Sequence, residues 1–246
     1  MENIYWVGDF DYETLTFTPD HREPLNADTG MYYSYNPSLI APDGRRIMFG
    51  WVTGAYSPSS AVPFWQGLHS IPREIHLVNG VLDQRPVREI ETLKTERIAV
   101  DMSVGDVQIS GTGRAYELSM VLPARACTQE IRVELLTDPD EADNRRAAAQ
   151  VLLSSSGSVT FCGKETVTTP RMFDSERETR VRIFVDSSVV EIYAECGGIS
   201  RAMTGRFFVR ENESLNAVRA VGVSVPELVL EKMEGIWERE PGMASK

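Results

Sequence analysis

The sequence is short of basic residues. It has 25 lysines and arginines against 36 aspartates and glutamates among 246 residues, which gives a formal net charge of -11 at pH 7. Nucleic-acid binding relies on lysine and arginine to neutralise phosphates, so this balance argues against a nucleic-acid partner. No apolar run approaches the roughly 20 residues of a membrane span, and the first residues lack the basic flank and apolar stretch of a signal peptide. We therefore expect no membrane partner, and no export signal is visible in this chain.

Cysteine is also scarce. Cys127, Cys162 and Cys196 lie about 35 residues apart, unlike the closely spaced ligands of a zinc site, and an odd number of cysteines cannot pair completely. We interpret them as buried or unreactive thiols, and the sequence predicts no metal and no cofactor.

The residues that are abundant indicate a folded protein made of strands. Hydrophobic residues make up 42% of the chain and charged residues 25%, which is typical of a globular protein, and the length fits one large all-β domain or two ordinary ones. No helical periodicity lasts longer than about two turns. Short runs rich in β-branched and aromatic residues recur between turn signals and predict strands at 4–7, 14–18, 31–35, 46–52 and 74–78. The last of these continues through Asn79-Gly80, a strong hairpin signal.

The second half of the chain predicts a two-sheet antiparallel β-sandwich. Nine short runs there can each present one apolar face, at 116–122, 130–136, 149–153, 158–161, 181–185, 189–194, 203–209, 218–225 and 228–237. Between the halves, Pro86 suits a first helical position and apolar residues form one stripe, so we expect a short linker helix near 86–94. We place the domain boundary near Arg97, with one domain at 1–97, the sandwich at 98–240 and a tail at 241–246.

Catalytic residues do not stand out from the residue pattern alone. The three histidines lack a Gly-x-Ser-x-Gly elbow, so a serine-histidine-acid site is not indicated. Asp9, Asp11 and Glu13 would share one face of a strand, as a pair of glycosidase carboxylates must, but a solvent-facing edge gives the same pattern. Asp186 and Glu191 are a second acidic pair, and Asp186-Ser187-Ser188 is better explained as hairpin turn chemistry.

Aromatic residues are concentrated in the first 65 positions. Sugar rings stack their apolar faces on such side chains while nearby acids bind the hydroxyl groups, although each aromatic could equally pack in a core. As a group they favour a carbohydrate ligand.

Five motifs occur in order along the chain. They are Tyr-Trp-Val-Gly at 5–8, Asp-Thr-Gly-Met-Tyr-Tyr-Ser at 28–34, Arg-Arg-Ile-Met-Phe-Gly-Trp at 45–51, Trp-Gln-Gly-Leu-His-Ser-Ile-Pro-Arg-Glu at 65–74, and the hairpin at 181–193. Together they resemble glycoside hydrolase family 32, the invertases, inulinases, levanases and sucrose-phosphate hydrolases. The order and spread of these motifs make chance similarity an unconvincing explanation.

The resemblance implies that the first part of the chain forms the last one to two blades of a five-bladed β-propeller. The family hydrolyses or transfers a terminal β-fructofuranosyl unit with retention of configuration. Its nucleophile, transition-state stabiliser and acid/base lie in Trp-Met-Asn-Asp-Pro-Asn-Gly, Arg-Asp-Pro and Glu-Cys-Pro segments, and this sequence contains none of the three. We therefore assign no catalytic residue and expect the chain alone to be inactive, because a retaining glycosidase needs both carboxylates.

Some residues match positions that line the family's substrate cleft. By resemblance, Asp28 helps to contact the sugar next to the fructose, and Met31 stands where some members carry lysine. Trp51, Tyr56 and Trp65 are further candidates for the cleft wall. Arg73 and Glu74 are interpreted as structural, tying neighbouring blades through a partly buried ion pair.

The leading hypothesis is a C-terminal fragment of a family 32 β-fructofuranosidase that acts, when intact, on sucrose, inulin or levan. The alternative is a non-catalytic fructan-binding or assembly module. The expected partners are a sucrose or fructan-type carbohydrate and either the missing half of the propeller or a second copy of the chain. Both a cytoplasmic and a secreted location are compatible with the sequence.

Overall fold

The computed structural model describes residues 3–30, 32–35, 38–52, 67–102, 105–125, 130–137, 147–163, 165–207, 215–222, 225 and 227–235. Within these residues the chain forms strands β1 to β23 and one short 3-10 helix, η1. The all-β class predicted from the sequence is confirmed. The described residues contain no helix that is long and apolar enough to span a membrane.

The largest sheet has eight strands, in the order β1-β4-β21-β20-β19-β14-β23-β12. Their bounds are β1 (Asn3–Tyr5), β4 (Leu25–Asp28), β12 (Lys94–Val100), β14 (Ala115–Leu122), β19 (Thr179–Asp186), β20 (Val189–Cys196), β21 (Ile199–Arg206) and β23 (Leu228–Met233). All neighbours are antiparallel except β4 and β21, which run parallel where Asp28 lies beside Ala202. Two N-terminal strands therefore extend a sheet whose other strands all lie between residues 94 and 233.

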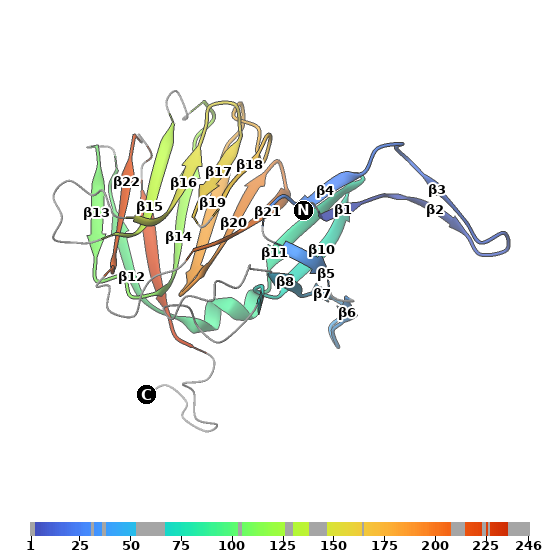
Figure 1. Cartoon of the computed structure of the whole chain (residues 1–246), viewed down its shortest axis with the longest axis horizontal. Helices are drawn as coiled ribbons and strands as arrows, with labels where there is room; N and C mark the ends of the chain where they lie inside the picture. The colour runs from blue at the N-terminus through green and yellow to red at the C-terminus, as the bar shows by residue number, and fades with distance from the viewer. Residues whose placement is uncertain are drawn as a thin grey trace, which may run out of the picture.

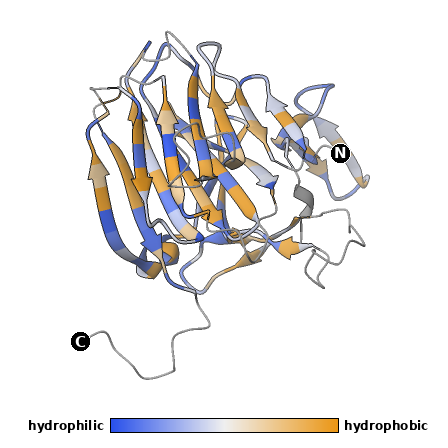
Figure 2. Cartoon of the chain, turned by 60° about the vertical axis from the view of Figure 1, so that its left-hand side comes forward, coloured by the Kyte–Doolittle hydropathy of each residue, from blue (hydrophilic) through white to orange (hydrophobic). Residues whose placement is uncertain are grey.

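A six-stranded antiparallel sheet has the order β13-β22-β15-β16-β17-β18. Its bounds are β13 (Val107–Ser110), β15 (Ile131–Thr137), β16 (Ala147–Leu153), β17 (Val159–Cys162), β18 (Thr166–Thr169) and β22 (Ala217–Val221). Hydrophobic and hydrophilic residues alternate along strands of the large sheets (Figure 2). The alternation follows from the two-residue period of a strand, which sends successive side chains to opposite faces.

The main hydrophobic core is shared by these two sheets. Leu118 and Ile183 contribute to it from the eight-stranded sheet, Val133 and Val151 contribute from the six-stranded sheet, and all four are fully buried. Burial of one such side chain stabilises the fold by about 1.5–3 kcal/mol relative to its exposed form. The outer face of the eight-stranded sheet is also covered, because Phe184 and Tyr193 pack against Ile71 and other apolar residues.

Three smaller sheets hold the remaining N-terminal strands, in the orders β11-β10-β7-β6, β5-β8-β9 and β2-β3. Their bounds are β2 (Gly8–Asp11), β3 (Thr16–Pro19), β5 (Tyr32–Tyr35), β6 (Leu39–Ile40), β7 (Arg46–Met48), β8 (Gly50–Val52), β9 (Leu68–His69), β10 (Arg73–Val78) and β11 (Val81–Pro86). Asn79 and Gly80 have φ angles of 51° and 73° and join β10 to β11, so the hairpin predicted there is confirmed. The β2–β3 hairpin projects away from the rest of the molecule (Figure 1).

Helix η1 (Arg88–Leu93) lies within the stretch 86–94, where the sequence predicts a helical turn. It leads directly into β12, which pairs with β23 at the far edge of the eight-stranded sheet. Arg97, near which we placed the domain boundary, lies inside this strand.

Candidate functional site

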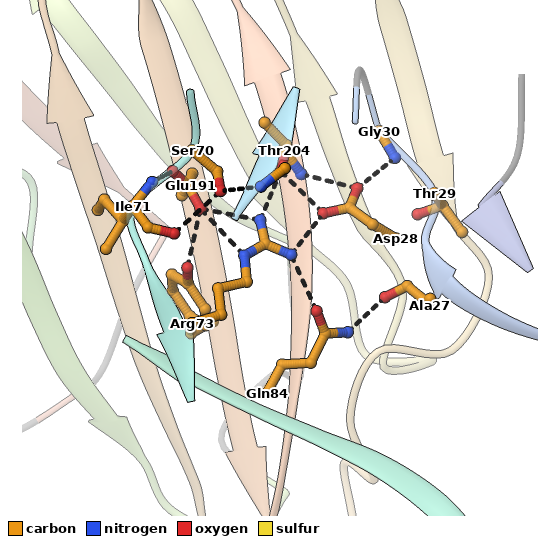
Figure 3. A network of polar contacts seen from close by, with 12 residues as sticks. Ala27, Asp28, Thr29, Gly30, Ser70, Ile71, Arg73, Gln84, Glu191 and Thr204 are labelled. Atoms are coloured by element: carbon orange, nitrogen blue, oxygen red, sulfur yellow. Dashed lines mark hydrogen bonds and ion pairs between the residues drawn. The ribbon is translucent and has the colours of Figure 1, made fainter. Parts of the chain in front are cut away.

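A fully buried arginine, Arg73, connects the N-terminal strands to the eight-stranded sheet (Figure 3). It is the first residue of β10, and its side chain is 0% exposed. Its Nη1 donates to Asp28 Oδ2 at 3.0 Å and to Gln84 Oε1 at 3.0 Å. The Gln84 amide nitrogen in turn donates to the Ala27 carbonyl at 2.6 Å. Strands β4, β10 and β11 are therefore joined through one guanidinium.

The other side of the same guanidinium faces strands β20 and β21. Arg73 Nε and Nη2 donate to Glu191 Oε2 at 3.2 and 2.8 Å, and Nη2 also donates to Thr204 Oγ1 at 2.8 Å. The Tyr193 ring lies 5.4 Å from the guanidinium carbon, and the Tyr193 hydroxyl donates to Glu191 Oε2 at 2.8 Å. The planar five-donor guanidinium is thereby matched by acceptors on several sides, as a buried arginine requires.

The Asp28 carboxylate, like the Arg73 guanidinium, is held by several hydrogen bonds. Its Oδ1 accepts the Gly30 and Thr204 backbone N–H groups at 2.8 and 3.1 Å, and its Oδ2 accepts the Thr204 hydroxyl at 2.8 Å. The Asp28 side chain is 0% exposed. The Asp28 carboxylate is therefore held within the protein by its hydrogen bonds to Gly30, Thr204 and Arg73, and its contact with a sugar stays a prediction.

Glu191 holds the segment before β10 in place. Its Oε1 accepts the Ile71 N–H at 2.6 Å, and Ser70 Oγ accepts the Gly50 N–H at 3.0 Å and donates to the Ile71 carbonyl at 2.9 Å. Three residues of the motif at 65–74, namely Ser70, Ile71 and Arg73, thus serve to fix the position of their own strand. We name the buried group formed by Asp28, Arg73, Gln84, Glu191 and Thr204 the Arg73 network.

The Arg73 network is suited to holding strands together rather than to bond cleavage. A nucleophile or general acid must reach the reacting atoms of a substrate. Here both carboxylates, Asp28 and Glu191, are at most 1% exposed and bind a guanidinium. The interpretation of Arg73 as structural agrees with this geometry, but the tie is fully buried and runs to β20 and β21. Glu74, also interpreted as structural, instead accepts from Arg45 Nη1 at 3.3 Å.

Trp51 is the one predicted cleft residue whose side chain the structure describes as partly open to solvent. It lies in β8 opposite His69 of β9, and it is 39% exposed. A Cβ on Gly67 would lie 2.0 Å from Trp51 Nε1, so the glycine leaves the space that the indole occupies. Met31, Tyr56 and Trp65 lie outside the described residues.

A second polar cluster surrounds Lys94 on the outer face of the eight-stranded sheet. Lys94 Nζ lies 2.6 Å from a Glu91 oxygen, 2.8 Å from Glu117 and 2.5 Å from Glu231, and Arg182 also pairs with Glu91 and Glu117. These residues line a cavity of about 570 Å³. Because two cations bridge three carboxylates across helix η1, β12, β14, β19 and β23, the cluster is suited to fastening the helix to the sheet.

The N-terminal hairpin presents large apolar side chains to solvent. Phe10, Tyr12, Leu15 and Phe17 are 45%, 84%, 76% and 44% exposed. The Phe10 and Tyr12 rings meet edge to face with centroids 4.9 Å apart. Asp11, predicted to share a face with Asp9 and Glu13, instead accepts the Glu13 N–H in the turn at 2.8 Å. Among the residues that the structure describes, no group of three or more His, Cys, Asp or Glu side chains is arranged to hold a metal ion.

Comparison with known proteins shows which family the chain resembles. The model of the "Glycosyl hydrolases family 32 N-terminal domain" matches residues 1–86. A sucrose-6-phosphate hydrolase of Vibrio alginolyticus is 26% identical over 245 residues, and a levanase of Bacillus subtilis (strain 168) is 29% identical over 269 residues. These matches cover 95% and 98% of this chain. The chain is therefore similar to glycoside hydrolase family 32, by the family model over residues 1–86 and by these relatives over nearly its whole length.

Solved structures of the family share the fold of the chain. The sucrose-6-phosphate hydrolase from Lactobacillus gasseri superposes with a TM-score of 0.74 at 23% identity, over 95% of this chain and 48% of that enzyme. Fructan 1-exohydrolase IIa from Cichorium intybus gives a TM-score of 0.72 at 17% identity. The chain spans about half the length of these family 32 proteins or less, since it covers 46% of the Vibrio relative and 39% of the levanase.

Sequence reasoning found Arg73 but missed its partners on the other side of the network. Glu191 carried a usable signal, because it is the one carboxylate among residues 189–194, which are otherwise apolar or aromatic. A carboxylate there must find a cation when both faces of the strand are buried. Thr204 and Gln84 gave no such signal, since uncharged polar side chains occur at many positions of a strand.

Proposed function

We propose that this chain is the C-terminal part of a family 32 β-fructofuranosidase. On this proposal, residues 1–97 form the last one to two blades of a five-bladed propeller, and residues 98–240 form a two-sheet sandwich. The intact protein hydrolyses terminal β-fructofuranosides, in sucrose, inulin or levan, with retention of configuration. The single observation that carries the proposal is an alignment over nearly the whole chain with a sucrose-6-phosphate hydrolase and a levanase that are about twice as long.

We further propose that the chain alone does not turn over substrate. Retaining glycosidases hold two carboxyl groups about 5–5.5 Å apart around the scissile bond. Asp28 and Glu191, the two carboxylates of the Arg73 network, both bind Arg73 and are closed to solvent. The three catalytic segments expected by resemblance are also missing from the sequence. The nucleophile and the acid must then come from a different polypeptide segment.

The contribution of this chain to the substrate cleft is proposed to be a wall of aromatic residues. Trp51 is held by β8 against β9 and is partly exposed, so one face of its indole can stack on a sugar ring. Met31, Tyr56 and Trp65 are proposed to line the same wall. Asp28 is proposed to act from behind it, by fixing the backbone of Gly30 next to Met31 through the hydrogen bond at 2.8 Å.

The companion segment is proposed to dock on the projecting hairpin. Exposed aromatic side chains on a two-stranded hairpin are costly in water, since an isolated hairpin is marginally stable and needs a third strand or another packing surface. Phe10, Tyr12 and Phe17 offer that surface. A polypeptide that carries the missing blades would cover these side chains and complete the unit.

The test compares the purified chain with the chain co-expressed with the preceding half of a family 32 propeller. Each sample is incubated with sucrose, inulin and levan at high protein concentration, and released fructose is measured. We expect fructose above background only from the reconstituted pair. We also expect the substitution Trp51→Ala to raise the KM of that pair for its substrate. Robust turnover by the chain alone would overturn the proposal. Saturable binding of fructo-oligosaccharides to the chain alone, without turnover by the pair, would favour the non-catalytic binding module.

A further inference from the structure

Three arginines gather at one end of the two large sheets. Arg171 follows β18, Arg177 lies in the loop before β19, and Arg201 lies in β21. All three are exposed, and they line one cavity of about 390 Å³ beside the β20–β21 turn. The Arg177 guanidinium lies over this turn, because a Cβ on Gly197 would be 2.8 Å from its Nη1.

The positive charge of this cavity is only partly neutralised. Its lining includes one carboxylate, that of Asp174, which lies 3.8 Å from Arg177 Nε and accepts the Glu176 N–H at 3.1 Å. Within the described part of the chain, neither Arg171 nor Arg201 has a carboxylate within ion-pair distance. Among the residues that the structure describes, the Arg201 guanidinium donates to the Met172 carbonyl, at 3.5 Å.

Other arginines of the chain form close ion pairs with carboxylates. Arg45 pairs with three carboxylates and Arg182 with two, at distances between 2.5 and 3.3 Å. In a protein with a formal net charge of -11, partners for three more arginines are abundant. A group of like charges left together in a concave site raises the local positive potential and attracts an anion.

The chemistry of the guanidinium narrows the class of anion. Its planar fork of N–H donors matches the oxygens of a phosphate or sulfate group in a bidentate manner, and such charge-assisted hydrogen bonds are about twice as strong as neutral ones. Three forks around one cavity suit a tetrahedral oxyanion with several oxygens better than a single carboxylate.

A second cavity adjoins the first and suits an uncharged group. It has a volume of about 330 Å³, and Arg171 and Arg201 line both cavities. Its other walls include Leu25, Val81 and Met172, together with Thr29 and other polar groups. A cavity of this size with apolar walls and a few polar groups is typical of a site for a small organic molecule.

We propose that Arg171, Arg177 and Arg201 form a binding site for a phosphate ester of a sugar-sized molecule. The phosphate group lies among the three guanidinium groups, and the uncharged body occupies the adjoining cavity. Neither Arg73 nor Trp51 lines either cavity, although Asp28, which binds Arg73 at 3.0 Å, forms part of the wall of the second one. The phosphate site itself does not depend on the function proposed above. No bond is made or broken in it.

The experiment titrates the full chain by calorimetry with fructose 6-phosphate, inorganic phosphate and fructose at constant ionic strength. We expect saturable binding of the ester, binding of inorganic phosphate that is weaker by about fivefold or more, and no heat from fructose. Arg171→Ala and Arg201→Ala should each weaken ester binding by about tenfold, the loss expected for one charge-assisted hydrogen-bonding group. The control is Arg22→Ala, which removes one positive charge from an exposed loop near the hairpin and should leave binding unchanged.

Three outcomes would overturn the proposal. In the first, neither fructose 6-phosphate nor inorganic phosphate binds saturably. In the second, Arg22→Ala weakens ester binding as much as Arg171→Ala and Arg201→Ala do. In the third, the ester binds no more tightly than inorganic phosphate. Thermal unfolding in phosphate-free buffer checks that the variants remain folded, as expected for exposed side chains. If Arg201→Ala unfolds, Arg177→Ala and Arg171→Ala still decide the question, since both residues lie in or beside a surface loop.

Discussion

Replacing Arg73 by methionine should lower the free energy of unfolding by about 3–5 kcal/mol, the range for breaking a buried ion pair from one side. Arg73 lies 3.0 Å from an Asp28 oxygen and 2.8 Å from a Glu191 oxygen, and these two side chains are 0% and 1% exposed. Methionine fills much of the arginine volume but leaves two buried carboxylates without a counterion. Because each carboxylate keeps other hydrogen bonds, from Gly30 and Ile71 among others, the loss should stay within that range.

Urea unfolding followed by tryptophan fluorescence measures this loss. Arg88→Met is the matched control, since the Arg88 side chain is 69% exposed and its 2.6 Å pair with Asp43 lies at the surface. Exposed pairs contribute about 0–1 kcal/mol. The triple variant Arg73→Met, Asp28→Asn and Glu191→Gln should recover part of the stability, because it removes every buried charge at once. The reasoning is refuted if Arg73→Met and Arg88→Met differ by less than about 1 kcal/mol, the upper end of the range for surface pairs.

Three further changes test other parts of the molecule. Gly30→Ala should lower the Tm by many degrees, since its Cβ would lie 1.7 Å from the Thr204 carbonyl oxygen; an unchanged Tm in calorimetry contradicts this close approach. Burial alone would raise the pKa of Glu91, but the hydrogen bond from Lys94 leaves this pKa lowered. The stabilisation of the folded chain by ionised Glu91 is therefore present above the unfolded pKa of about 4.3. It is lost as the pH falls through the lower pKa of Glu91 in the folded chain. Urea titrations between pH 6 and 3 should show a smaller acid loss in Glu91→Gln than in the parent chain, and equal losses would contradict this. Tyr12→Ser, at a position that is 84% exposed, should reduce self-association in light scattering without lowering the Tm; unchanged association would argue against the hairpin as a docking surface.

Local patterns predicted most strands, because alternation and turn signals are properties of neighbouring residues. The Asn79-Gly80 turn and the strand that begins near Tyr116 are found within one residue of their predicted positions. β21 was expected at 203–209 but spans Ile199–Arg206, since its first residues are polar or small and pair with β20 across a Gly-Gly turn. β13 and β18 were missed because four-residue runs with serine or threonine carry little apolar alternation. Such strands are stabilised by the neighbours that they pair with, which a local pattern does not reveal.

The partners of Arg73 could not be predicted from local patterns for a different reason. Glu191 and Thr204 lie 118 and 131 residues away from it along the chain. The sequence indicates that a buried arginine needs hydrogen-bond acceptors. Which residues act as acceptors depends on the strands that the fold brings together. The structural role expected of Arg73 agrees with its contacts to Asp28 and Gln84 of the N-terminal strands and to Glu191 and Thr204, while a tie between neighbouring blades stays a prediction.

The long-range contacts of Glu191 also bear on the proposed cleft. Val52 of β8 and Leu68 of β9 pack against Val189, the first residue of β20, and Glu191 on the same strand binds the Ile71 N–H just beyond β9. Trp51 lies between these attachments, so the orientation of its indole depends on a strand that belongs to the eight-stranded sheet. A sugar-binding wall built on β8 and β9 would thus be positioned by residues more than a hundred positions downstream. This dependence gives a physical reason why the motif at 65–74 and the hairpin at 181–193 occur together in this chain, since each supplies buried polar partners that the other requires.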